Sequence, residues 1–67
     1  MEFNLKQDYR YDKLISFLES NEIEHQELGD TMINKSIITF SFINKDYVLL
    51  LTGLRSNNFI YTLIYID

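Results

Sequence analysis

Two segments near the C-terminus are apolar at consecutive positions, without the apolar–polar alternation of a sheet that has one wet face. These runs are Tyr47–Leu51 and Phe59–Ile66, the second interrupted by Thr62. Successive side chains of a strand point to opposite sides, so strands of this composition place apolar groups on both faces of a sheet. A chain built on them must cover both faces itself or leave one face for a partner.

The sequence predicts one helix, over residues 8–20. Its apolar residues recur at the i, i+3, i+4, i+7 spacing of a single helical face, namely Tyr11, Leu14, Ile15 and Leu18. Asp8 is expected to act as the N-cap, and Asn21 is expected to end the helix in the left-handed conformation. A lone helix of this length buries its apolar stripe against one face of a sheet.

Four strands are expected to follow the helix as an antiparallel meander. They are predicted at 22–28, 36–43, 46–52 and 59–66, with residues 1–7 forming an extended arm or a short strand. Gly29-Asp30 and Asn44-Lys45 are the expected hairpin turns, and the Gly-, Ser- and Asn-containing segment 53–58 is the expected loop. The predicted fold class is α+β, in one small domain spanning residues 1–67.

These turns fix the expected register. With the Asn44-Lys45 turn, Phe42 is predicted to lie opposite Tyr47. With the Gly29-Asp30 turn, Leu28 lies opposite Thr31 and Glu24 opposite Lys35. The favoured alignment of the last strand places Phe59 opposite Leu51, which gathers the aromatic residues on one face.

The helix is expected to leave one apolar sheet face uncovered. The residues predicted for that face are Val48, Leu50, Ile60, Ile64 and Ile66. Monomeric proteins rarely expose a large contiguous apolar patch, so a second copy related by a two-fold axis is the favoured cover. In one alternative, the N-terminal arm with Met1, Phe3 and Leu5 folds over this face. In the other, the face is simply semi-exposed and rich in threonine.

Negative charge is concentrated in the first half of the chain. The net charge is −4, and residues 1–30 carry eight acids and three bases, giving −5. An acidic patch without any base is formed by Glu19, Glu22, Glu24, Glu27 and Asp30. This balance excludes direct binding to a phosphate backbone, which requires a basic surface. The patch is expected either to face a partner or to keep an exposed strand soluble and unpaired.

No pattern in the sequence predicts a catalytic, cofactor or metal site. There is no cysteine, and His25 is the one histidine. Phosphate-loop, dinucleotide, zinc-protease and EF-hand motifs are all missing from the sequence. A lone histidine on an acidic strand is most simply a surface residue. The lack of cysteine, of a secretory signal and of an apolar stretch long enough to cross a bilayer predicts a cytoplasmic protein.

The function expected from these features is a small, acidic, non-enzymatic protein-interaction module, such as an inhibitor or regulator. Its partner is another protein or a second copy, with a homodimer through the sheet favoured, and no membrane is involved. One alternative is an acidic mimic of nucleic acid that binds the basic groove of a DNA- or RNA-handling protein. A further alternative is an oligomeric enzyme whose site is shared between subunits.

Overall fold

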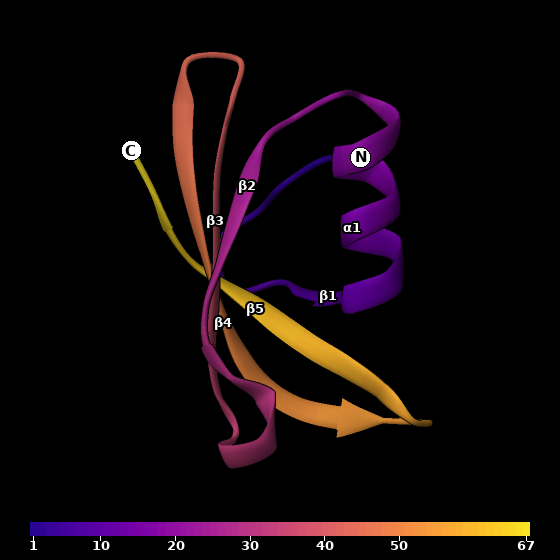
Figure 1. The fold of residues 1–67 in the computed structure, drawn as a ribbon. Helices are drawn as coiled ribbons and strands as arrows, with labels where there is room; N and C mark the ends of the chain where they lie inside the picture. Colours follow the sequence, from indigo (N-terminus) through magenta and orange to yellow (C-terminus); the bar gives the residue numbers. More distant parts are fainter.

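One α-helix and a five-stranded antiparallel sheet make up the computed structural model, which describes residues 1–67 (Figure 1). In chain order the elements are β1 (Asp8–Arg10), α1 (Tyr11–Ser20), β2 (His25–Asp30), the short 3₁₀ helix η1 (Thr31–Ile33), β3 (Lys35–Phe42), β4 (Lys45–Arg55) and β5 (Asn58–Ile66). The strand order across the sheet is β1-β5-β4-β3-β2. The α+β class is confirmed, whereas the expected count of four strands is one too low.

The additional strand, β1, occupies residues that were expected to begin the helix. Asp8–Arg10 pair with β5, with Asp8 opposite Thr62 and Arg10 opposite Ile60. The helix therefore begins after Arg10, which makes no side-chain capping hydrogen bond. The Asp8 carboxylate instead accepts a hydrogen bond of 2.6 Å from the Thr62 hydroxyl. The N-cap prediction for Asp8 is wrong because pairing with β5 takes up these residues.

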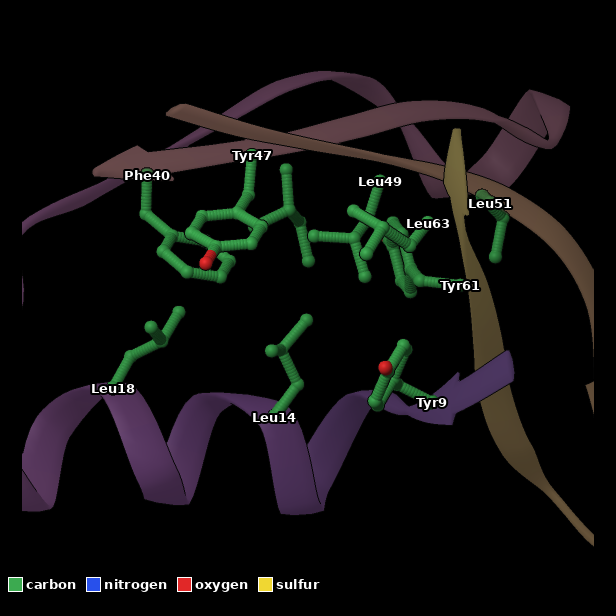
Figure 2. Packing of buried hydrophobic residues seen from close by; sticks show 10 residues of the cluster. Tyr9, Leu14, Leu18, Phe40, Tyr47, Leu49, Leu51, Tyr61 and Leu63 are labelled. Carbon is green, nitrogen blue, oxygen red and sulfur yellow. The ribbon is translucent and has the colours of Figure 1, made fainter. Parts of the chain in front are cut away.

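The face of α1 that points to the sheet is the one predicted from the sequence. Leu14 and Leu18 are fully buried, while Tyr11 and Ile15 lie half-buried at the flanks of the stripe. In Figure 2 both leucines point into a layer of side chains from the sheet, which includes Phe40, Tyr47, Leu49, Leu51, Tyr61 and Leu63. The helix ends at Ser20, and Glu22 rather than Asn21 adopts the left-handed conformation, with φ 55°.

The N-terminal arm packs on the same side of the sheet as α1. The Phe3 ring lies with its centroid 5.2 Å from those of Phe40 and Tyr47 and 5.5 Å from that of Phe17. Aromatic pairs at these separations contribute stability beyond their buried area. The alternative in which this arm covers the second face of the sheet is therefore wrong.

The turn between β3 and β4 is one residue earlier than predicted. Ile43 and Asn44 have φ values of 50° and 63°, so the turn residues are Ile43-Asn44 rather than Asn44-Lys45. Phe40 consequently lies opposite Tyr47, and Phe42 opposite Lys45. This shifts the pairing by two positions, which changes each side chain's partner without moving it to the other face.

Strand β4 continues through the segment that was expected to be a loop. It runs to Arg55, and Ser56-Asn57, with φ 51° and 64°, form the tight turn into β5. Phe59 therefore pairs with Leu54, and Leu51 pairs with Tyr61. The register shifts twice, between Leu51 and Gly53 and between Val48 and Leu49, as at β-bulges. The second shift turns Tyr65 away from the helix side.

The connection from β2 to β3 is longer than the two-residue turn expected at Gly29-Asp30. Both residues belong to β2, with Gly29 opposite Ser36 and Asp30 opposite Lys35. Gly29 has φ 91°, and a side chain there would collide with the Lys35 backbone carbonyl, so glycine is required within the strand. The Asp30 carboxylate caps η1 by accepting from the Met32 amide at 2.8 Å. The expected pairing of Leu28 with Thr31 is wrong, since Leu28 lies opposite Ile37.

Replacement of Leu14 or Leu18 by alanine is expected to destabilise the fold by about 2–5 kcal/mol, because each substitution leaves a cavity in the core. Ser16, exposed on the other side of α1, provides the control, and Ser16→Ala should change stability by less than about 0.5 kcal/mol. Urea denaturation followed by circular dichroism measures both. Wild-type midpoints for the two leucine variants would contradict this packing.

Candidate functional site

The sheet face turned away from α1 carries a continuous band of apolar side chains. Two rows of paired residues cross it. One row is Gln26, Thr39, Val48 and Tyr65, and the other is Leu28, Ile37, Leu50 and Thr62. We call these eight residues the open face. Leu28 and Tyr65 are 51% and 50% exposed, and the three central aliphatic side chains are half-buried by their neighbours alone.

Nothing in the chain covers this band. Figure 1 shows α1 and the N-terminal arm together on one side of the sheet, with no element packed on the other. Alternate residues of each strand point to the helix side and belong to the core cluster. Ile38 and Leu49, for example, lie in the core, whereas their sequence neighbours Ile37 and Leu50 lie on the open face. The open face is thus the outer side of the strands whose inner side forms the core.

Polar groups border the open face where β1, β4 and β5 meet. The Thr52 and Thr62 hydroxyls lie 2.7 Å apart, and Thr62 donates to the Asp8 carboxylate. Arg55 approaches the same carboxylate, with its Nη2 3.6 Å from Oδ2. These hydrogen bonds link the three strands at this border of the open face.

The five residues predicted for the uncovered face do not all lie on it. Val48 and Leu50 are at its centre. Ile60, which pairs with Gly53, is only 4% exposed and so adds little to the accessible surface. Ile64 lies at the register shift and is 48% exposed. Ile66 packs against the core on the helix side, because the shift between Leu63 and Tyr65 reverses the alternation at the end of β5.

Leu28 and Tyr65 were not predicted for this face. Alternation along the strand places Ile37 on the same face as Val48 and Leu50, and Leu28 joins it as a cross-strand pair once β2 is aligned correctly on β3. A signal for Leu28 is present in the sequence, since it is the one aliphatic residue in the polar stretch from Glu24 to Gly29. Tyr65 was expected on the other face, and no sequence pattern marks the bulge that moves it.

The acidic patch is distributed along one edge of the molecule. Glu19 lies in the last turn of α1, Glu22 in the turn that follows, and Glu24 just before the edge strand β2. None of these three carboxylates forms an ion pair within the chain, because the three ion pairs of the structure involve other acids. The expected partnership of Glu24 with Lys35 is wrong, since Lys35 lies opposite Asp30.

The other two acids of the patch make contacts within the chain. Asp30 caps η1, as described above, and Glu27 links β2 to the helix by accepting a hydrogen bond of 2.7 Å from the Tyr11 hydroxyl. The second oxygen of Glu27 lies 3.7 Å from Nε2 of His25. Burial, the hydrogen bond to Glu27 and the charge of that carboxylate together raise the pKa of Tyr11 to about 12.

This constellation of Tyr11, Glu27 and His25 is suited to holding β2 against α1. A raised tyrosine pKa keeps the hydroxyl protonated and makes it a poor base or nucleophile at neutral pH. The shallow groove beside His25 is lined by the start of β2 and the facing ends of β3 and β4.

Comparisons with protein-family models, with curated proteins and with solved structures find no match to this chain. In the structure, no group of three or more histidine, cysteine, aspartate or glutamate side chains is arranged to hold a metal ion. No helix has the length and apolar character needed to cross a membrane.

The stability of the protein is expected to fall as the pH rises from about 10 to about 12. The folded state holds the Tyr11 proton more tightly than the unfolded state does, so its stabilising contribution is complete below the unfolded pKa and is lost above it. Urea midpoints measured across this range should fall less steeply in Tyr11→Phe. Equal slopes for the two proteins would show that Tyr11 is not the responsible group.

Proposed function

We propose that this protein is a non-enzymatic interaction module that binds another protein chain through the open face, acting as an inhibitor or regulator in the cytoplasm. The proposal depends on one observation, which is that no helix or strand of the chain packs against the apolar band. This band is formed by Leu28, Ile37, Val48, Leu50 and Tyr65. Contiguous exposed apolar surface of this kind is typical of protein–protein contacts.

The composition of the open face supports contact with protein. Its centre is aliphatic, with Tyr65 at the β5 side, and its border carries hydroxyl, amide and charged groups, as in interfaces with an apolar core and a polar rim. Tyr65 is half exposed, and tyrosine is among the residues that contribute most to binding energy. The cysteine-free sequence is compatible with a reducing cytoplasm.

A second candidate function is supported by the three unpaired carboxylates Glu19, Glu22 and Glu24. A row of acids without ion-pair partners resembles, in charge alone, the phosphates that a basic groove binds. In this case the protein would act as a nucleic-acid mimic. Its binding would weaken strongly with added salt, whereas apolar docking changes little.

The test is affinity capture from an extract of the native cell with three forms of the protein. The open-face variant carries Leu50→Thr and Tyr65→Thr, which keep strand-forming side chains but remove apolar area. The matched control is Leu54→Thr, on the same strand but paired with the core-side residue Phe59 and 63% exposed. A captured protein is then purified and its affinity measured directly.

The proposal requires a purified partner whose affinity falls about tenfold or more in the open-face variant and is unchanged in the control. A partner that binds the open-face variant normally but loses affinity in Glu22→Gln/Glu24→Gln, with a steep salt dependence, would replace the proposal by mimicry. A folded open-face variant that retains every captured partner and its own association state would refute the proposed function.

A further inference from the structure

Independently of the proposed function, we infer that residues 24–34 form a detachable edge of the sheet, which opens as a unit while the rest of the fold stays intact. This edge segment consists of Glu24, strand β2, η1 and Asn34. Its opening takes Leu28 off the open face and uncovers the backbone of β3, which is then the edge of the sheet. The extent of the open face therefore depends on whether this segment is closed.

The edge segment contributes nothing to the core. None of its residues is buried, and only His25 and Thr31 are half-buried. Its large apolar side chains, Leu28, Met32 and Ile33, are 51%, 88% and 62% exposed, and none of them packs against the core cluster. Ordering a segment costs conformational entropy, which the burial of apolar area normally offsets. The edge segment has little of this compensation.

The residues that flank the edge segment are anchored in the core. On one side, Ile23 packs against the core cluster, and its amide donates to the Leu18 carbonyl at 2.8 Å. On the other side, Ser36 is 4% exposed and shares a hydrogen bond of 2.7 Å with the Tyr61 hydroxyl. These two anchors set the limits of the opening unit, because the chain between them can move without disturbing either.

Few interactions hold the edge segment closed. The six residues of β2 pair with β3 on one side only, since β2 is an edge strand. Only one side-chain hydrogen bond or ion pair, from the Tyr11 hydroxyl to Glu27, joins the segment to the rest of the chain. Gly29 lies within the pairing at φ 91°, outside the range of a regular strand, and glycine inside a strand weakens it.

The opposite edge of the sheet is anchored in a different way. Strand β1 carries Tyr9, which is 7% exposed and belongs to the core cluster. Backbone pairing continues beyond β1 through Lys6 and Gln7, which bond to the Leu63 backbone at 2.8 and 3.1 Å. We therefore expect the three-residue strand β1 to stay closed under conditions in which the six-residue strand β2 opens.

Native-state hydrogen exchange, measured by NMR at increasing urea concentration, tests the inference in the wild-type protein. Opening of the edge segment exposes little surface, so its amides should exchange with a weak dependence on urea and about tenfold or more faster than core amides. Amides along β3 bond alternately to β2 and to β4. Those bonded to β2 should exchange with the edge segment, and those bonded to β4 should exchange with the core.

The variant Gly29→Ala perturbs the edge segment selectively. The added side chain would collide with the Lys35 backbone carbonyl, so β2 must move away from β3. The collision is absent once the segment is open, so core amides should lose no more protection than the segment itself has in the wild-type protein. The matched control is Gly53→Ala in β4, where an added Cβ meets no atom within 4 Å, and its edge segment should exchange as in wild type.

Exchange of the edge segment and the core at one common rate, with one common urea dependence, would overturn the inference, since the sheet would then open only as a whole. The inference also fails if Gly29→Ala unfolds completely while Gly53→Ala stays folded, or if its core loses more protection than the wild-type segment has. Neither result bears on the proposed function, which is tested by partner binding to the open face.

Discussion

The packing of α1 against one face of the sheet is the contact on which the rest of the structure depends. Leu14 and Leu18 are the only fully buried residues that the helix contributes, and they cover the layer formed by Ile38, Leu49 and Leu63. A helix of ten residues is about 15 Å long and shields one face alone. Residues 1–67 form no second α-helix on the other face, and the apolar outer positions of β3, β4 and β5 remain open in this structure.

Residues before the helix complete the ends of the core. Phe3 reaches back from the N-terminus to close the core between α1 and the β3–β4 end of the sheet, and β1 covers the outer edge of β5. Inside the core, the one buried polar side chain, Ser36, shares a hydrogen bond of 2.7 Å with the Tyr61 hydroxyl, and no buried side-chain polar atom is left without a partner. The helix side of the sheet is thus a packed core whose buried polar side-chain atoms all have hydrogen-bond partners. No element of the chain packs against the outer side.

Sequence periodicity was sufficient to predict the helix, its buried face and the doubly apolar strands, because these depend on spacing alone. Turn chemistry was less informative. Ile43 is a β-branched residue with positive φ, a conformation that Asn or Gly adopts more easily, so the turn is displaced from the position that composition favours. The bulge beside Leu63 follows from the fit of β5 on β4 and moves Tyr65 and Ile66 to faces opposite to those expected. Ile37, Val48 and Leu50 were therefore predictable from alternation, whereas Leu28 and Tyr65 required the register.

One face of this sheet is closed by the chain and the other is not. Methyl NMR with a soluble paramagnetic agent, recorded at high dilution, measures the access of solvent to each side directly. We expect strong relaxation of the Leu28, Val48 and Leu50 methyl groups and little effect on those of Leu14, Leu49 and Leu63. Equal protection of both sets at a dilution where the protein is monomeric would contradict it, since the chain itself would then be covering both faces.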